Sequence, residues 1–295
     1  MQVQRRTQTF ARAKKYNIAP ELLNEEYLIK RKSQSEIAKL LGVSQWVISQ
    51  RMRKSNLITR KKTWRLTEQR YCQKYPVNIH FFDVLTPKNA WVLGWISSDG
   101  FINKNKESHA FGLKLNKKDI DVLIKIKNLI GYAGPILEYK TFLKKTNKNY
   151  SECLLKISNK RIVKRLEELG ICSNKSQNER FPIEIKVSDN EALIKNFIKG
   201  FFEGDGSIIY TKNSLLFQIV GTKEILRDIQ YFLMRYLMLN KTKLTRNILD
   251  KNHWALRYRG NKQTIKIFDW LYSDNELCLN RKYNKYLQIK EELKK

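Results

Sequence analysis

Two segments of the chain are apolar almost all the way around a helix. Residues 90–100 and 197–206 carry hydrophobic side chains at most positions and end in an Asp-Gly pair. A helix that is apolar on every side belongs in a protein interior. Each segment also has a glycine in its middle, Gly94 and Gly200, which costs about 1 kcal/mol unless another backbone must come close. The pattern predicts that the two helices pack against each other.

These segments begin a longer internal repeat. Asp99 and Asp205 are 106 positions apart, and each is followed by an alternating strand pattern, at 111–118 and 215–220, that leads into a helical pattern. Alternation of this kind places one face of a strand on the core and leaves the other open. Each half is therefore expected to form a helix, two strands, a helix, two strands and a helix, which predicts an α+β fold built as a pseudo-symmetric tandem αββαββα repeat.

The starts of the two apolar helices carry recognisable signals. Thr86 and Pro87 supply a capping residue and a proline in the first turn. Ser188 and Glu191 have the spacing of a capping box. We therefore expect the first helix to begin at Pro87 and the second to be capped by Ser188.

Residues 33–57 have the pattern of a helix-turn-helix. Ser35 is expected to cap the first helix, Gly42 to form the turn and Ser44 to cap the second helix. The expected inward side chains are Ile37, Ala38, Leu41, Ile48 and Met52. The expected outward side chains, which can reach base edges or phosphates in a major groove, are Gln45, Trp46, Ser49, Gln50 and Arg53. The alternative is a small three-helix bundle with a solvated basic face.

Charge narrows the choice of partner. The 295 residues include 58 Lys or Arg and 28 Asp or Glu, a formal net charge of +30, and residues 1–70 alone hold 17 basic against five acidic side chains. This excess predicts a polyanionic partner such as nucleic acid. The 42% hydrophobic content argues against a disordered basic tail. The predicted organisation is a DNA-binding helix-turn-helix domain at 1–60, a basic linker at 61–85, and two repeats at 86–187 and 188–295.

The cysteines and histidines argue against zinc and disulfides. Four cysteines are widely spaced without a CxxC pair, and the three histidines are scattered. This indicates a reducing intracellular compartment, with cytoplasm, nucleoid and organelle matrix left open. No stretch approaches the roughly 18 apolar residues of a membrane span, so no membrane association is expected. Any metal should be held by oxygen ligands, which suits Mg²⁺.

Both apolar segments, with their terminal Asp-Gly, resemble the LAGLIDADG motif of homing endonucleases in the single-chain form with two copies. The resemblance covers about 210 of the 295 residues, from Pro87 to the C-terminus. It implies a β-sheet saddle that binds double-stranded DNA with a long target site. It also implies a monomeric, site-specific endonuclease that hydrolyses phosphodiester bonds with divalent metal ions.

The resemblance also implies roles for particular residues. Asp99 and Asp205 are expected to bind Mg²⁺, for which Mn²⁺ or Ca²⁺ should substitute in binding, and the preceding carbonyls of Ser98 and Gly204 are expected to assist. Basic residues beside the two sites are implied at Lys175 and Lys282.

Further residues are expected to position the attacking water and to contact DNA. The resemblance implies a polar residue at the end of the second strand of each half, a position that falls on Asn116 and on Gly221. Because glycine has no side chain to hold a water, an asymmetric second pocket is expected. Side chains expected on the DNA-facing strand surfaces are Asn103, Lys114, Asn116, Lys140, Lys212, Gln218, Lys243, Arg246, Arg257 and Arg259.

An alternative function stays open at this stage. A non-cleaving nucleic-acid binder on the same scaffold, either a splicing cofactor (maturase) that binds intron RNA or a transcription regulator, would have the same basic charge and fold. The acidic residues discriminate between the two, because members that no longer cleave commonly lack one of them, whereas both Asp99 and Asp205 are present here. Cleavage is therefore the leading prediction. Whether the protein is intron-encoded or free-standing stays open.

Overall fold

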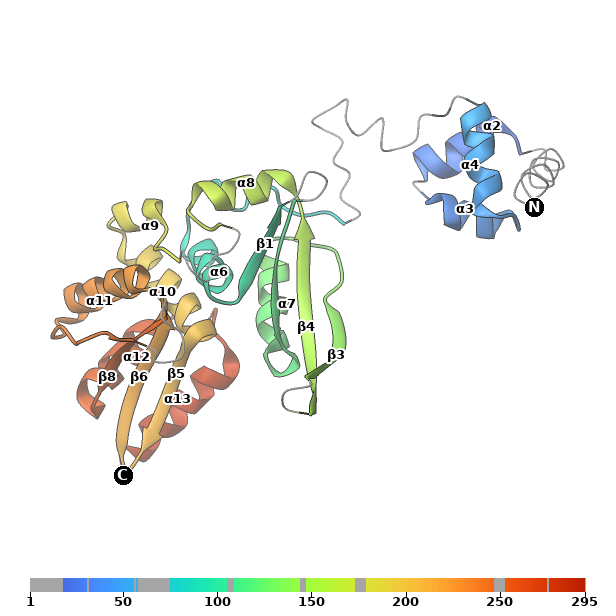
Figure 1. Cartoon of the computed structure of the whole chain (residues 1–295). Coiled ribbons are helices and arrows are strands. Elements are labelled where there is room, and N and C mark those ends of the chain that lie inside the picture. Colours follow the sequence, from blue (N-terminus) through green and yellow to red (C-terminus); the bar gives the residue numbers. More distant parts are fainter. Residues whose placement is uncertain are drawn as a thin grey trace. The chain divides into compact units, whose positions relative to one another are not determined.

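The computed structural model describes residues 18–30, 32–55, 57, 75–104, 109–143, 147–172, 179–246, 253–274 and 276–294. These residues form two compact units, one within Met1–Cys72 and one within Gln73–Lys295 (Figure 1). Within the described ranges, no helix has the length and apolar character needed to cross a membrane.

The first unit is a small helical cluster. Its elements are α2 (Pro20–Asn24), the π-helical turn η1 (Glu25–Ile29), α3 (Gln34–Leu40) and α4 (Gln45–Lys54). Its core contains Leu23, Tyr27, Ile37, Ala38, Ile48 and Met52, with Leu41 packed against it. Gly42 makes the turn between α3 and α4 with a positive φ of 63°, a conformation that glycine adopts without strain. Ser44 caps α4, as predicted.

The predicted cap of the preceding helix was wrong. Ser33, not Ser35, caps α3: its hydroxyl accepts a hydrogen bond from the Glu36 N–H, and the Glu36 carboxylate accepts one from the Ser33 N–H. This reciprocal pairing needs an acidic or amide side chain three residues after the cap. Ser35 is followed at that spacing by Ala38, so it has no such partner.

The second unit contains the tandem αββαββα repeat. The first half comprises α6 (Pro87–Ser98), β1 (Gly100–Lys104), β2 (His109–Asn116), η3 (Lys117–Asp119), α7 (Ile120–Leu129), β3 (Leu137–Leu143), β4 (Lys148–Ser158) and α8 (Lys160–Glu168). After α9 (Ile183–Val187), the second half comprises α10 (Glu191–Asp205), β5 (Gly206–Thr211), β6 (Ser214–Gly221), α11 (Lys223–Leu237), β7 (Thr245–Arg246), β8 (Trp254–Arg259), α12 (Asn261–Leu271) and α13 (Asn280–Glu292). The antiparallel strand orders, β1-β2-β4-β3 and β5-β6-β8-β7, are equivalent. The predicted α+β class is confirmed.

The two apolar helices, α6 and α10, pack against each other, as their glycines predict (Figure 1). A Cβ atom on Gly94 would lie 2.3 Å from the Phe197 carbonyl oxygen, and one on Gly200 would lie 2.2 Å from the Trp91 carbonyl oxygen. Both distances are far inside van der Waals contact, so only glycine allows this approach. The backbones of the two halves therefore meet directly at the centre of the unit.

The starts of these helices agree with the sequence prediction in one case and differ in the other. Thr86 caps α6 with Pro87 in the first turn. Asn190 caps α10, and its side chain accepts hydrogen bonds from the N–H groups of Ala192 and Leu193. Ser188 was the wrong choice because its hydroxyl instead donates to the Ile185 carbonyl at the end of α9.

The C-terminal part of the predicted linker packs onto the second unit. The side chain of Phe82 is buried in its core. The Asn78 N–H donates to the Ile130 carbonyl at 2.9 Å, and the Ala133 N–H donates to the Pro76 carbonyl at 3.0 Å. These contacts fix the chain that leads into α6.

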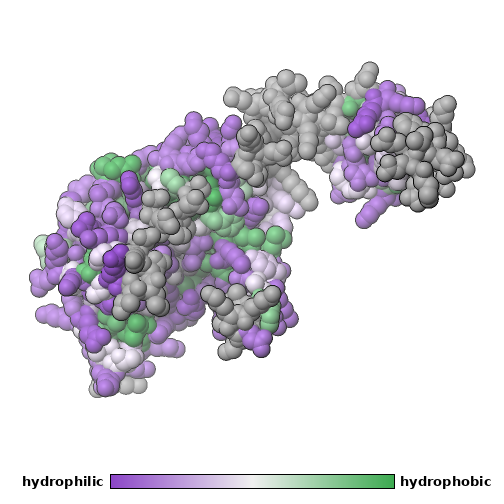
Figure 2. Space-filling view, in the orientation of Figure 1, coloured by the Kyte–Doolittle hydropathy of each residue, from purple (hydrophilic) through white to green (hydrophobic). Residues whose placement is uncertain are grey.

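Each sheet has a face covered by helices and an open face. On β2, Phe111, Leu113 and Leu115 are buried, whereas Lys114 and Asn116 between and after them are exposed. Hydrophilic side chains dominate the visible surface, with only small hydrophobic areas between them (Figure 2). The open faces are therefore available to a polar partner.

Candidate functional site

The site is built where α6 and α10 end. Asp99 follows the last turn of α6, and its N–H donates to the Trp95 carbonyl at 3.1 Å. Asp205 is the last residue of α10. Each aspartate is followed directly by the first residue of a strand, Gly100 of β1 and Gly206 of β5. The two carboxylates thus stand at equivalent junctions between a central helix and a sheet.

The helices stay in contact up to these ends. A Cβ atom on Gly204 would lie 2.0 Å from the Ser98 hydroxyl oxygen and 2.9 Å from an Asp99 carboxylate oxygen. The Asp99 carboxylate therefore lies against the backbone that immediately precedes Asp205. Asp99 is exposed and Asp205 is half-buried. Two acids at the negative ends of two helix dipoles raise the local negative potential, which favours a cation.

Lys282, from α13, places a positive charge beneath this junction. Its ammonium group is buried and donates to the carbonyls of Phe202 at 2.9 Å, Glu203 at 2.6 Å and Gly206 at 2.6 Å. Burial, together with the charge of Arg281, lowers the pKa of Lys282 to about 8, against the opposing charges of Glu203, Asp99 and Asp205. The lysine therefore holds the end of α10 in place, with its hydrogen atoms directed at backbone oxygens.

A second contact from α13 ties the site to the other half. Arg281 donates two hydrogen bonds to the Asp119 carboxylate of η3 from one edge of its guanidinium group, at 2.5 Å from Nε and 2.8 Å from Nη2. Bidentate pairs of this kind fix geometry as well as charge. The hydrogen bond to Asp119 raises the pKa of Arg281, and the charge of Asp99 contributes to that rise. The arginine charge therefore also acts on the Asp99 carboxylate.

Glu203 joins the two central helices beneath the aspartates. One carboxylate oxygen accepts the indole N–H groups of Trp91 at 2.8 Å and Trp95 at 3.2 Å, and the other accepts the Leu279 N–H at 2.9 Å. Burial raises the pKa of Glu203 to about 7, opposed by these hydrogen bonds and by the charges of Lys199 and Lys282. Glu203 is therefore a structural contact between the halves, buried beneath the Asp99 and Asp205 carboxylates.

Sequence reasoning missed the roles of Asp119, Lys199 and Arg281 in this arrangement. Lys199 is fully buried, and its ammonium group donates to the Asp274 carbonyl at 2.9 Å. A usable signal existed in α10, where Lys199 and Glu203 are opposite charges four residues apart within its most apolar stretch. The Arg281–Asp119 pair spans 162 residues, and no local pattern predicts it.

The oxygen groups at the helix ends suit a hard cation. Asp99 and Asp205 offer carboxylates, and Ser98 and Gly204 offer the preceding carbonyls. In the part of the chain that the structure describes, no cluster of three or more His, Cys, Asp or Glu side chains could hold a metal. Mg²⁺ is commonly held by one or two carboxylates, with waters and substrate phosphates as its other ligands, so the residues present fit it.

Strand register decides which of the predicted DNA-contacting residues share the open faces. In the first sheet, Lys114 pairs with Leu154 and Asn116 with Glu152. Directly paired residues of an antiparallel sheet share a face. By register, the open faces carry Asn103, Lys114 and Asn116 in the first sheet and Gln218, Arg257 and Arg259 in the second. Arg257 donates to the Gln218 side chain at 2.6 Å, which orders both groups.

The remaining predicted contacts lie elsewhere. Lys140 pairs with Ser151 and Arg246 with Trp254, so both are on the helix-covered side of their sheets, contrary to prediction. One residue of offset along a strand reverses the face. Lys212 occupies the tip of the β5–β6 hairpin, Lys243 lies in the segment before β7, and Lys175 lies outside the described residues.

The predicted equivalence of Asn116 and Gly221 is also wrong. The motif glycine Gly100 pairs with Leu113, and Gly206 pairs with Ile219, so the counterpart of Asn116 is Thr222. Both cap the next helical turn, since the Asn116 side chain accepts from the Lys118 N–H and the Thr222 hydroxyl from the Ile225 N–H. Gly221 is therefore no sign of a missing polar group.

In the first unit, the predicted recognition face lies on α4. Gln45, Trp46 and Arg53 are exposed, and Ser49 and Gln50 are half-buried. Val47, Ile48 and Met52 form the buried side of the helix. The five polar and aromatic positions are thus separated from the core of the unit.

Comparisons with known proteins give limited similarity. No protein-family model matches the chain. An uncharacterized protein of Methanocaldococcus jannaschii is 28% identical over 127 residues, which is 42% of each protein, so the match spans less than half of that relative.

Solved structures resemble the chain over a larger part of its length. The I-LtrWI LAGLIDADG homing endonuclease bound to target DNA matches 74% of this chain and 91% of its own, with 15% identity and a TM-score of 0.45. I-SmaMI bound to cleaved DNA matches 70% and 88%, with 15% identity and a TM-score of 0.46. I-GzeII in complex with its DNA target matches 72% and 90%, with 15% identity and a TM-score of 0.45. The chain is similar to these enzymes.

Proposed function

We propose that this protein is a site-specific DNA endonuclease that cuts both strands with divalent metal ions held at Asp99 and Asp205. The observation that supports it most directly is the contact between the Asp99 carboxylate and Gly204, which brings the two acids to one place between two polar sheets. The net charge of +30 supports a nucleic acid as the substrate. When bound, Mg²⁺ would polarise a water and neutralise charge on the scissile phosphate.

The residues around the acids have distinct proposed roles. Lys282 fixes the end of α10, so that the Gly204 carbonyl and the Asp205 carboxylate keep their orientation. Arg281 holds Asp119 of the other half and keeps the two helix ends in register. Preorganised groups of this kind lower the reorganisation needed in the transition state. Both residues are therefore positioning residues, and Asp99 and Asp205 are the metal ligands.

Specificity is proposed to come from the open sheet faces. Arg257 and Gln218, held together by a hydrogen bond, can read purine edges, and Lys114 can bind phosphates. Because the target is unknown, the first experiment selects cleaved sequences from a randomised DNA library in Mg²⁺. The selected site is then placed in a supercoiled plasmid and tested for linear product.

The decisive variant is Asp99→Asn combined with Asp205→Asn. Loss of both charges should abolish linear product while duplex binding persists. The matched control is Asp189→Asn with Asp228→Asn, which removes two charges from exposed ion pairs with Arg235 and Lys186. Asn tolerates the positive φ of 52° at position 189. Undiminished cutting by the Asp99 and Asp205 variant would refute the proposal, and tight binding by wild type without any cutting would favour the non-cleaving binder.

We propose that the first unit extends the DNA contact through α4. Arg53 and Gln45 are exposed on its outer side. Arg53→Ala with Lys54→Ala should weaken binding to long sites and reduce the slope of log affinity against log salt by roughly one per lost phosphate contact. The control is Lys39→Ala, on the exposed side of α3. An unchanged slope in the α4 variant would exclude this contact.

A further inference from the structure

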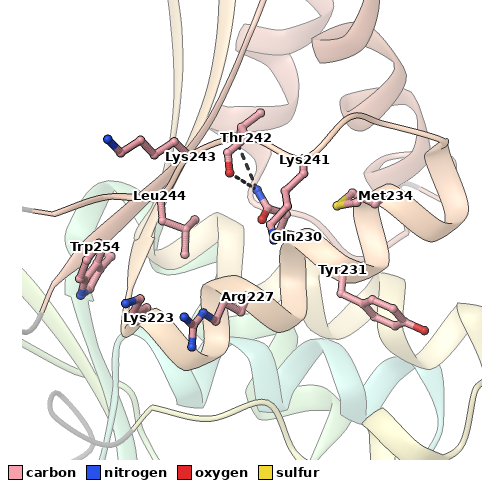
Figure 3. Close-up of a pocket in the computed structure, with 10 residues that line it drawn as sticks. All are labelled: Lys223, Arg227, Gln230, Tyr231, Met234, Lys241, Thr242, Lys243, Leu244 and Trp254. Atoms are coloured by element: carbon pink, nitrogen blue, oxygen red, sulfur yellow. Dashed lines mark hydrogen bonds between the residues drawn. The ribbon is translucent and has the colours of Figure 1, made fainter.

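A basic cavity lies beside the second sheet, and none of the residues described around Asp99 and Asp205 lines it. Its volume is about 570 Å³. One wall is the face of α11 that carries Lys223, Arg227 and Tyr231, and the other is the returning segment with Lys241. Trp254 of β8 lies at one end and Tyr231 at the other (Figure 3). The cavity therefore combines cations with aromatic rings.

The walls of the cavity are held in place by specific contacts. Met238, with a left-handed φ of 50°, ends α11 and reverses the chain. The Gln230 amide, which is buried, then donates to the Thr242 carbonyl at 2.8 Å and to its hydroxyl at 3.1 Å, as the dashed lines in Figure 3 indicate. The Lys223 ammonium lies 4.6 Å from the centre of the Trp254 ring, a distance typical of a cation–π contact. The cations are thus attached to an ordered frame.

Among the residues that the structure describes, no carboxylate lines the cavity or pairs with its cations. The lining includes Lys223, Arg227, Lys241 and Lys243 and contains no Asp or Glu. Among the described residues, none of these four cations forms an ion pair. Asp228, on the same helix, pairs with Lys186 instead, at 2.6 Å. Four uncompensated cations around one cavity favour a ligand with more than one negative charge.

The internal repeat supplies a control for this charge. The counterpart of Lys223 in the first half is Lys117, which forms an ion pair with Glu138 at 2.5 Å. The counterpart of Arg227 is Asp121, an acid that accepts a hydrogen bond from the Asn280 N–H. The shared fold therefore does not require uncompensated cations at these positions. Their accumulation is specific to the second half, where it creates a cavity suited to an anion.

The edge strand β7 connects the cavity to the open face of the second sheet. Arg257, on that face, donates to the Thr245 hydroxyl of β7 at 2.6 Å. Thr245 directly follows Leu244, which lines the cavity. A strand of nucleic acid on the open face could therefore pass over the short β7 edge and reach the cations.

We propose that this cavity binds the phosphates of a nucleic-acid strand that continues past the β7 edge, with an attached base against the exposed ring of Tyr231. The inference rests on the proposed function, since the strand is the one that leaves the DNA-binding face. Aromatic contacts with bases strengthen the binding of single strands and tolerate any sequence. The ligand is therefore an unpaired segment recognised by charge and stacking.

The test measures binding of a fluorescent single-stranded oligothymidylate to the full chain. Arg227→Gln with Lys241→Gln should weaken binding about tenfold and lower the salt slope by roughly 0.7 for each lost contact. The matched control, Lys117→Gln with Lys118→Gln, removes two lysines at the equivalent place in the first half. Equal affinities and slopes for the two double variants would overturn the proposal.

Two further measurements identify the ligand. Tyr231→Leu should weaken binding of the oligothymidylate but leave binding of an abasic oligonucleotide unchanged. An oligonucleotide carrying iododeoxyuridine should cross-link under light to Tyr231 or Trp254, as mapped by mass spectrometry. If Tyr231→Leu has no effect and inorganic pyrophosphate competes as well as the oligonucleotide does, a small phosphate is the ligand and the strand is excluded.

The nuclease proposal and the cavity proposal can be refuted independently of each other. The variant with Asp99→Asn and Asp205→Asn should keep wild-type affinity for the oligothymidylate, because the cavity is intact. Binding that depends on Arg227 and Lys241 without plasmid cleavage would remove only the nuclease proposal. Plasmid cleavage with cavity variants that bind like wild type would remove only the cavity proposal.

Discussion

The two halves of the second unit share a fold but use equivalent positions in complementary ways. In α6, Trp91 and Trp95 donate their indole N–H groups, and in α10 Glu203 accepts them. The counterpart of Glu203 in α6 is Ser97, and the glycines Gly94 and Gly200 are the same in both. Backbone contact across a pseudo-dyad needs the same residue on both sides, whereas a hydrogen bond needs a donor on one side and an acceptor on the other. Repetition therefore fixes the packing, and divergence supplies the polar contacts.

The backbone contact between α6 and α10, which both halves share, can be tested at either glycine. Gly94→Ala and Gly200→Ala should each lower the free energy of unfolding by about 3 kcal/mol or more, since the added Cβ meets backbone that cannot move without separating the helices. Urea unfolding followed by circular dichroism measures this. Gly221→Ala is the control, because its Cβ would meet side-chain atoms alone, the nearest being Cγ2 of Ile225 at 3.1 Å. A small loss at Gly94 with a large one at Gly200 would contradict the symmetric contact.

The hydrogen bonds in which α6 donates and α10 accepts can be tested by comparing Glu203→Ala with Ser97→Ala. Loss of the Glu203 carboxylate leaves two indole N–H groups and the Leu279 N–H without their acceptor, which should lower the free energy of unfolding by about 2–3 kcal/mol. Ser97→Ala, at the equivalent place in α6, should change it by less than about 1 kcal/mol. If urea titrations gave the same loss of unfolding free energy for both variants, the proposed division into a donor helix and an acceptor helix would be wrong.

The sequence predicted the symmetric features better than the asymmetric ones. The helix contact at Gly94 and Gly200 could be read from apolar periodicity and a glycine in the middle of each helix, both local signals. The strand faces were harder, because one residue of register reverses a face, and Lys140 and Arg246 were misplaced for that reason. The Arg281–Asp119 pair joins residues far apart in the chain, so only the tertiary fold reveals it.

Misreading the caps had a common cause. Ser35 and Ser188 each lie two residues after or before the true cap, in segments where several side chains could serve. The choice depends on the backbone conformation of the preceding turn, which local composition does not determine. Such errors shift a helix start by a few residues and leave the site unchanged, since Asp99 and Asp205 are placed by the other ends of the helices.

Replacement of Lys282, which supports the end of α10 in the second half, should have a smaller effect on stability than the changes at Gly94, Gly200 and Glu203. Lys282→Met should leave the Phe202, Glu203 and Gly206 carbonyls without their shared donor and lower the free energy of unfolding by about 2 kcal/mol. It should also raise the Mg²⁺ concentration needed for plasmid cleavage. Lys285→Met is the control, because within the described part of the chain Lys285 donates to one backbone oxygen, the Ile208 carbonyl at 2.7 Å. Equal metal dependence in the two variants would exclude a positioning role.

The smallest effect concerns Lys199, whose counterpart in α6 is the apolar Leu93. Burial lowers the pKa of Lys199 below its ordinary value of 10.5. A lysine with a depressed folded pKa contributes its full stability above 10.5 and loses it as the pH falls through the folded value. The wild type should therefore gain stability over Lys199→Met as the pH rises from neutral toward 10.5. At that limit, its hydrogen bond to the Asp274 carbonyl should favour the wild type by about 1 kcal/mol. Urea unfolding of both proteins across this range measures the difference, and groups that do not interact with Lys199 cancel. Glu203, whose pKa the Lys199 charge lowers, contributes to the difference near neutral pH. A difference that stays constant with pH would mean that the Lys199 ammonium is hydrated in the folded protein, and α10 would then resemble α6 in burying no desolvated charge at this position.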